Sequence, residues 1–178
     1  MKDNQREETI YFAGLFDGEG TICIQKMYSE KYMKAQARVN PGYTVCIRLG
    51  MIDKSVVEEI QKFFGVGQLH CEKIYHAKRP VYRWQVRAQK DVRMVIEKLL
   101  PFLRVKRQQS ELAIKWLNEC LWKSGMSRKH GWPPEMVEKR EFMRLEMQRL
   151  NGIDVSPATT KRKGIMGRAK GVRVEAIV

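Results

Sequence analysis

Hydrophobic residues alternate with polar ones in four short segments of the chain, at 21–27, 43–51, 66–74 and 81–88. The last segment is the clearest, because Tyr82, Trp84 and Val86 occupy every second position. A period of two with one apolar face is typical of an antiparallel sheet that is covered on one side only. The sequence therefore predicts four antiparallel strands with one buried face and one open, polar face.

Five other segments have the hydrophobic spacing and the terminal residues of helices, at 4–17, 53–65, 90–100, 107–125 and 133–152. Asp53 or Ser55 is expected to begin the second helix and Gly65 to end it, whereas prolines begin the last helix and Gly152 ends it. The last helix is expected to bury an apolar stripe in the core, formed by Met136, Met143, Met147 and Leu150. The order of elements predicts an α+β fold, αββαββα followed by C-terminal helices.

Residues 1–154 are predicted to form one domain, because a chain of 178 residues with 43% apolar content can bury a sizeable core. Beyond 154 the pattern fades, and 161–178 contains six Lys and Arg but one acid. We predict a basic, flexible tail at 155–178. The alternative is that its last residues, in which apolar positions alternate from Val172 to Ala176, add a strand or pack on a helix.

The net charge narrows the class of partner. The whole chain has a net charge of +14, and the +5 of 161–178 leaves +9 on the remainder. A folded domain with this excess favours a polyanion as partner, nucleic acid first and an anionic membrane second. An inert basic surface is the remaining alternative.

The cysteines and the N-terminal residues indicate a compartment. The four cysteines contain no CxxC pair, which argues against a zinc site and favours reduced thiols. The first residues lack the apolar segment of a signal peptide, and no apolar run has the length of a membrane span. We therefore expect an intracellular protein without a membrane partner, in the cytoplasm or in an organellar matrix.

The open face of the predicted sheet carries Thr, Gln, His and Arg rather than the Lys and Glu mixture of an ordinary solvent face. Such side chains suit hydrogen bonds to base edges in the major groove of DNA, which admits a two-stranded ribbon. An ordinary wet face is the alternative. The candidate DNA-binding residues are Thr21, Cys23, Gln25, Thr44, Cys46, Arg48, Gln68, His70, Glu72, Arg83, Gln85 and Arg87.

The segment FAGLFDGEG at 12–20 ends an apolar helix with two acids separated by a glycine. Because a buried carboxylate is costly unless it is compensated, Asp17 and Glu19 are expected to form either a cap or a metal site. Gly14 and Gly18 lie four residues apart, on one face of the helix, so that a second backbone can approach closely.

This segment resembles the LAGLIDADG motif of homing endonucleases. The αββαββα order, the FGVG segment at 64–67 and the basic segment PFLRVKRQQ at 101–109 are also similar to that family, and the resemblance extends over 9–118. It implies a saddle-like sheet and two motif helices that pack side by side along a twofold axis. Gly14, Asp17 and Gly18 are implied to lie at that interface. For Asp17 the alternatives are a cap and, less favoured, a direct role at the metal.

The family pattern also assigns roles in cleavage. Glu19 is implied to be the catalytic acid and a ligand of Mg²⁺, because hard divalent ions prefer carboxylate and phosphate oxygens. Lys106 is implied to support the phosphate or to position water. The alternative is that Lys106 only contacts backbone phosphate together with Arg104 and Arg107.

Because the chain contains a single motif, the resemblance implies a homodimer and a nearly palindromic target. We predict a Mg²⁺-dependent, site-specific endonuclease that hydrolyses both strands of DNA and has no small-molecule substrate. Two alternatives on the same scaffold are a DNA-binding regulator that does not cleave and an RNA-binding intron maturase. The family often has a water-positioning Gln at the end of the second strand, where this chain has Leu49 and Met51.

Overall fold

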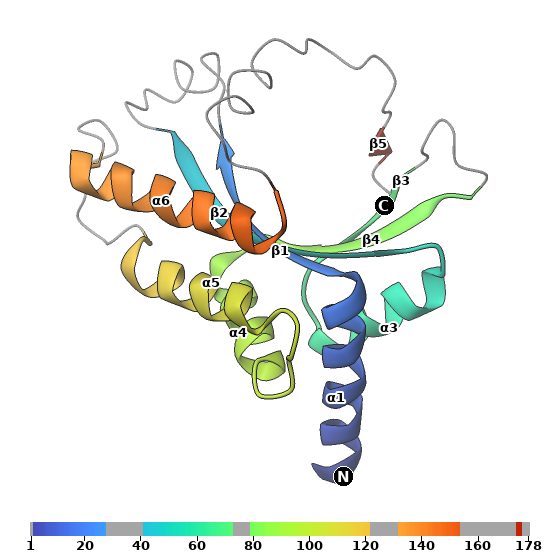
Figure 1. Ribbon diagram of the computed structural model, residues 1–178. Helices are drawn as coiled ribbons and strands as arrows, with labels where there is room; N and C mark the ends of the chain where they lie inside the picture. Colours follow the sequence, from blue (N-terminus) through green and yellow to red (C-terminus); the bar gives the residue numbers. More distant parts are fainter. Residues whose placement is uncertain (1, 28–40, 73–78, 122–131, 154–173, 176–178) are drawn as a thin grey trace.

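An antiparallel sheet lies at the centre of the molecule, and helices pack below it (Figure 1). The computed structural model describes residues 2–27, 41–72, 79–121, 132–153 and 174–175. The main strands are β1 (Gly20–Met27), β2 (Gly42–Met51), β3 (Gln68–Glu72) and β4 (Val81–Val86), in the spatial order β1-β2-β4-β3. All neighbouring strands are antiparallel, which confirms the predicted sheet.

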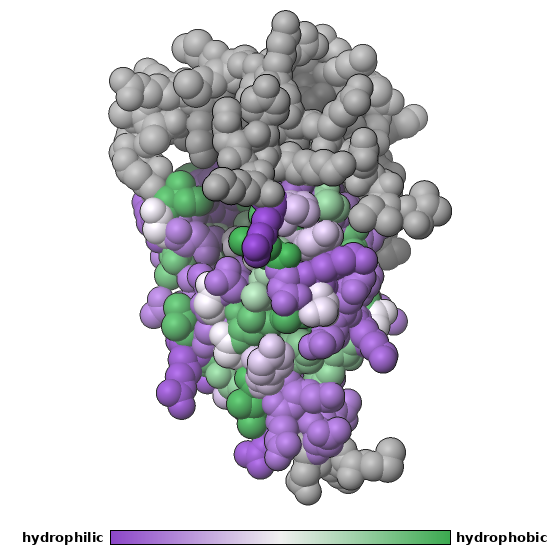
Figure 2. Space-filling view, turned by 90° about the vertical axis from the view of Figure 1, so that its right-hand side faces the viewer, coloured by the Kyte–Doolittle hydropathy of each residue, from purple (hydrophilic) through white to green (hydrophobic). Residues whose placement is uncertain are grey.

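The helices of the described residues confirm the predicted α+β order. They are α1 (Lys2–Glu19), α3 (Lys54–Phe64), α4 (Gln89–Leu99), α5 (Arg107–Glu119) and α6 (Pro134–Leu150). Helix α1 extends beyond the other helices, with the N terminus at the end far from the sheet (Figure 1), and that end is hydrophilic (Figure 2). No helix in this part of the chain is long and apolar enough to cross a membrane.

Helix α1 continues two residues beyond its predicted end at Asp17, and β1 begins directly after Glu19. Gly20 makes this direct junction possible. A Cβ atom there would lie 2.4 Å from the carbonyl oxygen of Phe16 and 2.5 Å from its ring. The second acid of the motif therefore occupies the last position of the helix.

Helix α5 ends at Glu119, although the sequence pattern predicted helix as far as 125. The carbonyl oxygen of the next residue, Cys120, accepts a hydrogen bond from the guanidinium of Arg140 in α6. Cys120 itself has φ −116° and ψ 0°, which lies outside the helical region, so the helix ends before it. Residues 122–131 lie outside the described ones.

The apolar face of the sheet is buried, as the alternation predicted. Helices α1, α3 and α4 pack on strand residues that are fully buried, among them Ile22, Ile47, Leu49 and Trp84. Phe12 of α1 contacts Phe64 of α3, and the Phe64 ring stacks on Trp84 of β4 with centroids 5.5 Å apart. This aromatic series fixes α1 and α3 to one part of the sheet.

The predicted boundaries of α3 and the FGVG segment have clear structural causes. Asp53 accepts the backbone N–H of Ser55 at 2.9 Å, and Gly65 ends the helix with φ +66°. Gly67 has φ +91°, and a Cβ atom there would lie 2.4 Å from Nε1 of Trp84. The segment thus passes directly against Trp84, whose Nε1 donates to the Val66 carbonyl at 2.8 Å.

Helix α6 packs against β1 and α5, which places its methionine stripe in the core as predicted. Met143 and Met147 are buried, Met136 packs against the core, and Leu150 is half-buried. At the C-terminal end, Asn151 donates to the Ile22 carbonyl at 2.8 Å. These contacts attach the helix along the outer strand of the sheet.

Glu141 connects α6 to the end of the β1–β2 pair. Its carboxylate accepts hydrogen bonds from Tyr43 at 2.7 Å and from Lys26 at 3.0 Å, and it pairs with Arg144. Burial raises the pKa of this carboxyl, but the hydrogen bonds from Arg144, Tyr43 and Lys26 outweigh it and lower the pKa to about 2. Glu141 is therefore ionised at every ordinary pH.

A short strand from the predicted tail lies at the far edge of the sheet. Strand β5 (Val174–Glu175) pairs with β3 in antiparallel register, opposite Glu72 and Cys71. This is the arrangement that the strand alternative for the tail describes. Residues 154–173 and 176–178 lie outside the described part, so the prediction of a flexible tail stays a prediction there.

Candidate functional site

The candidate DNA-binding residues on β1 to β4 share one side of the sheet, which we call the polar face. The strand register places Thr21, Arg48, Gln85 and Gln68 opposite one another, so that they form a row across all four strands. The register also pairs the other candidates side by side: Cys23 with Cys46, Gln25 with Thr44, and His70 with Arg83. The alternation of the sequence thus produces one continuous polar surface.

The residues of the polar face differ in how far they are exposed to solvent. Thr21, Gln68 and Arg87 are exposed, and most of the others are half-buried. Cys46 was predicted to contact DNA, but its side chain is fully buried and cannot make a direct contact. The side-chain amide of Gln85 lies 3.0 Å from the Cys46 sulfur and partly covers it. Cys46 therefore supports the polar face from below.

Several polar side chains bond to each other. Arg83 forms an ion pair with Glu72 on the neighbouring strand. With its amide in the alternative orientation, Gln85 accepts from Nε of Arg48 and from Nε of Arg87, each at 3.0 Å. The two arginines nearest the middle of the face are thus held by one glutamine, which fixes the direction in which their guanidinium groups point.

The two cysteines of the face form a coupled pair. A hydrogen bond from Cys23, aided by Arg48, lowers the pKa of the Cys46 thiol against the opposing effect of burial. The same hydrogen bond, together with burial, raises the pKa of Cys23. Thiolate character is therefore concentrated on Cys46.

Gln89, at the start of α4, was not among the sequence candidates, yet it fixes one end of the polar face. Its Nε2 donates to Thr44 Oγ1 at 2.8 Å and to the Arg87 carbonyl at 2.7 Å, and its Oε1 accepts the Val45 N–H at 3.2 Å. It thereby joins the start of β2 to the chain leaving β4. A glutamine in the first turn of a helix gives no sequence signal for such a bridge.

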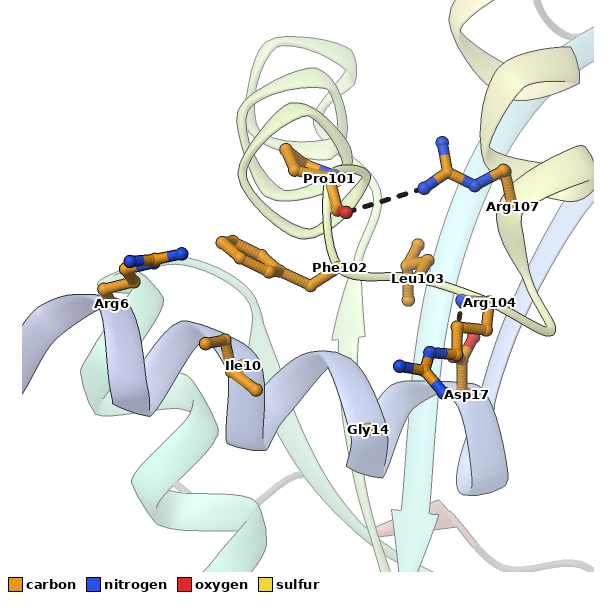
Figure 3. A pocket seen from close by; sticks show the side chains of 9 residues that line it. All are labelled: Arg6, Ile10, Gly14, Asp17, Pro101, Phe102, Leu103, Arg104 and Arg107. Carbon is orange, nitrogen blue, oxygen red and sulfur yellow. Dashed lines mark hydrogen bonds between the residues drawn. The ribbon is translucent and has the colours of Figure 1, made fainter.

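Asp17 holds the loop between α4 and α5 against the end of α1. One carboxylate oxygen accepts the backbone N–H of Arg104 at 2.7 Å, and the other accepts that of Lys106 at 2.8 Å. Figure 3 shows Asp17 directly beside Arg104. Asp17 therefore acts as a cap, but of a distant loop, and it brings Lys106 to the same end of α1 as Glu19.

Glu19 differs from Asp17 in its surroundings. Two residues along a helix correspond to a rotation of about 200°, so the two acids leave α1 in nearly opposite directions. Glu19 is exposed, and its carboxylate has no hydrogen bond or ion pair to the part of the chain that the structure describes. The last turn of α1 also contains no basic residue. A carboxylate at the negative end of a helix dipole is unfavourable by itself, so this position favours a bound cation.

The outward side of α1 is unusually bare. Cβ atoms at Gly14 and Gly18 would meet nothing within 4 Å, while Ile10 and Tyr11 on this side are about half exposed, at 46% and 53%. A cleft of about 500 Å³ adjoins it, lined by Ile10, Gly14 and Asp17 of α1 and by the loop around Phe102 (Figure 3). The bare helix side and the cleft together form a surface that a second helix would fit.

The end of the second strand lacks a polar group at the positions that the family pattern singled out. Leu49 is fully buried, and Met51 packs against the core. Leu49 is the register partner of Gly20, directly beside Glu19. A water near Glu19 therefore has no hydrogen-bonding side chain from these two positions.

The model of the LAGLIDADG endonuclease family matches residues 12–113 of the chain. That range contains the motif, the four main strands and the Asp17-bound loop. Among curated protein sequences, none matched the chain significantly.

Similar folds occur in solved structures of homing endonucleases. I-CvuI in complex with its target has a TM-score of 0.68 at 19% identity, covering 90% of this chain and 93% of that one. The archaeal intron-encoded I-Vdi141I complexed with DNA has a TM-score of 0.62 at 14% identity, covering 84% and 86%. The meganuclease I-AabMI bound to uncleaved DNA has a TM-score of 0.56 at 15% identity. The matched region covers 90% of this chain but only 50% of I-AabMI. At these identities the similarity concerns the fold.

Proposed function

The chain belongs to the LAGLIDADG endonuclease family, and we propose that it is a homodimeric, site-specific endonuclease that cleaves both strands of DNA. One observation carries the proposal. Asp17 fixes the backbone of Lys106 to the end of α1, where the Glu19 carboxylate is unpaired within the described part of the chain. Phosphodiester hydrolysis needs both groups near the phosphate.

DNA binding by the polar face is supported by its chemistry and by the net charge. Arg48, Arg87 and Gln85 present donors and acceptors that match base edges, and the chain carries +14. A duplex on this face would also lie next to Glu19, because Thr21, the first member of the face, is two residues away. I-CvuI and I-Vdi141I, which have the same fold, are complexed with DNA.

A homodimer follows from the number of acids. One chain contributes one Glu19, whereas cleavage of both strands needs an acid at each scissile phosphate. The bare side of α1 at Gly14 and Gly18 allows two copies of the helix to approach closely about a twofold axis. This chain covers about half of I-AabMI, which is consistent with one chain supplying one of two similar halves.

The donor set fits a hard divalent cation, and Mg²⁺ is our proposal for the metal. The Glu19 carboxylate is exposed and unpaired within the described residues, but it cannot form a site alone. Those residues contain no cluster of three His, Cys, Asp or Glu. Carboxylates from two copies and the phosphate oxygens of DNA would complete the oxygen ligation that Mg²⁺ prefers. I-CvuI structures were determined in the presence of Mg and of Ca.

The chain's own residues would divide the work of hydrolysis. A divalent ion supplies an activated water and neutralises charge on the phosphate. Glu19 would hold that ion at the end of the helix, and Lys106 would place a positive charge near the phosphate as the negative charge builds up. Asp17 fixes the backbone of Lys106 to the end of α1, so that the two side chains would start from a constant separation.

The test begins with selection of cleaved sites from a DNA library in the presence of Mg²⁺. Glu19→Gln should then abolish cleavage and leave affinity for the selected site within about a factor of two to three, because the change keeps the shape of the side chain. Glu8→Gln is the matched control, since Glu8 is also an exposed acid of α1 but lies near its other end. Cleavage by Glu19→Gln at the normal rate would refute the proposed role.

A second candidate is a DNA-binding protein on this scaffold that does not cleave. The apolar Leu49 and Met51 at the end of β2 favour it, because neither side chain can bond a water near Glu19. The same selection distinguishes the two. Enrichment of bound sites without any cleaved product, in Mg²⁺ or in Mn²⁺, would establish the non-cleaving protein.

A further inference from the structure

Two of the four free cysteines lie directly opposite each other on neighbouring strands of the polar face. Cys23 of β1 is the register partner of Cys46 of β2, and both strands are in regular antiparallel pairing around them. Cys71 belongs to the other side of its strand, because it alternates with His70 and Glu72. Cys120 lies at the end of α5. Cys23 and Cys46 are therefore the one cysteine pair that the polar face contains.

The spacing of such a pair allows a covalent bond. Directly opposed residues of antiparallel strands have Cα atoms about 4.5–5.5 Å apart, and disulfides bridge Cα separations of about 4.4–6.8 Å. Side chains of opposed residues also point to the same side of a sheet. A bond between the two sulfurs therefore needs no change of strand pairing.

The surroundings of the pair favour reaction. The hydrogen bond from Cys23 is the largest cause of the lowered pKa of Cys46, and the nearby Arg48 guanidinium lowers this pKa further. The thiolate is the reactive form of cysteine. Cys46 is buried, but Cys23 is partly exposed, so the pair reaches solvent through Cys23.

We propose that Cys23 and Cys46 form an oxidation site in the floor of the polar face, where a peroxide converts the two thiols into a reversible disulfide. One thiolate attacks the peroxide, breaks its O–O bond and becomes a sulfenic acid as hydroxide leaves. The second thiol then displaces water from the sulfenic acid and forms the S–S bond. The peroxide takes up the two electrons, and two thiols and one peroxide give one disulfide and two waters.

Oxidation has a defined consequence for the polar face. A disulfide sulfur carries no negative charge, so Arg48 loses the anionic partner beneath it. The site is also expected to be shielded when DNA lies on the face. This second expectation rests on the proposed function, whereas disulfide formation in the free protein does not.

The experiment uses the full-length chain, fully reduced and then treated with hydrogen peroxide. The expected result is an intact mass lower by two hydrogens and a peptide in which Cys23 is linked to Cys46, both reversed by dithiothreitol. Cys71→Ser, the matched control, should still form the link, and Cys23→Ser should not. Absence of the Cys23–Cys46 link at peroxide concentrations that oxidise Cys71 would overturn the proposal.

A further arm separates this proposal from the proposed function. The same treatment is repeated with a selected target duplex in excess, and formation of the link is followed over time. Slowing by about tenfold or more is expected if the duplex covers the polar face. An unchanged rate, with the link still forming in the free protein, would leave the oxidation site in place and contradict DNA binding by this face.

Discussion

The end of α1 and the polar face of the sheet are held together by different kinds of contact. At the end of α1, Asp17 bonds two backbone N–H groups, so the loop of Lys106 is fixed whatever side chains it carries. On the polar face, Arg48, Gln85 and Arg87 bond mainly to each other through side chains. The first region maintains one geometry, as cleavage requires, whereas the second can change its residues without moving the backbone, as recognition of different sequences requires.

The largest effect is expected from Gly14→Leu, which tests the bare side of α1. A Cβ atom at Gly14 would meet nothing within 4 Å among the described residues, so the fold and its melting temperature should be retained. In the dimer the leucine would be forced between two helices, and we expect a monomer without measurable cleavage. Sedimentation and thermal melting measure both properties.

Glu138→Leu serves as the control for Gly14→Leu, because it places a leucine on an exposed helical position of α6. It should leave the dimer intact. A normal dimer in Gly14→Leu would show that Gly14 lies outside the interface.

The next effect is expected from Asp17→Ala, which removes the two hydrogen bonds between this side chain and the loop of Lys106. The loss of two hydrogen bonds to a carboxylate should lower the free energy of unfolding by about 1–3 kcal/mol. Displacement of Lys106 should slow cleavage by about 100-fold, with much smaller change in DNA affinity. Single-turnover cleavage and binding titrations separate the two.

Asp53→Ala is the matched control for Asp17→Ala, since Asp53 also accepts a backbone N–H but caps α3. It should reduce stability slightly and leave cleavage per folded molecule unchanged. Equal loss of cleavage in both variants would mean that Asp17 acts through general stability alone.

A smaller and more selective effect is expected from Gln85→Ala, which disturbs the side-chain bonds of the polar face. Base discrimination should fall by about 1–3 kcal/mol at the positions that Gln85 contacts. Because Gln85 also orients Arg48, the effects of Gln85→Ala and Arg48→Ala should be non-additive in a double-mutant cycle.

Binding of single-base variants of the target measures this discrimination, with Gln5→Ala at the far end of α1 as control. Additive effects of Gln85→Ala and Arg48→Ala would contradict the coupling. An unchanged preference at every base would show that Gln85 contacts phosphate or no DNA at all.

The smallest effect concerns the support of the polar face by α6. Glu141→Gln should lower the free energy of unfolding at pH 7 by about 1–3 kcal/mol, because it weakens the bonds from Tyr43, Lys26 and Arg144. The folded-state pKa of about 2 lies below the ordinary value of 4.5. The contribution is therefore complete above about pH 4.5 and is lost as the pH falls toward 2.

Denaturant unfolding of both proteins at pH 7 and pH 3 tests this sign. The difference between native and Glu141→Gln should be smaller at pH 3. Glu146→Gln, which changes a more exposed acid of the same helix, should show little difference at either pH.

The sequence alone predicted the sheet, its buried side and the ends of α3, because these depend on neighbours a few residues apart. It did not predict contacts that depend on tertiary structure. Asp17 bonds a loop 87 and 89 positions away, and Arg140 of α6 bonds the Cys120 carbonyl after the end of α5. The burial of Cys46 depends on side chains from other strands, which alternation cannot supply.

The junction at Gly20 has a consequence for the relation between cutting and recognition. No loop separates the acid of the helix from the first residue of the strand that faces DNA, and Glu19 and Thr21 are only two residues apart. Two residues span about 7 Å, which is about two base-pair steps. On the proposed function, the distance along the duplex between the cleaved bond and the recognised bases is therefore constant. Insertion of a single residue here would shift the position of the cut relative to the recognised bases.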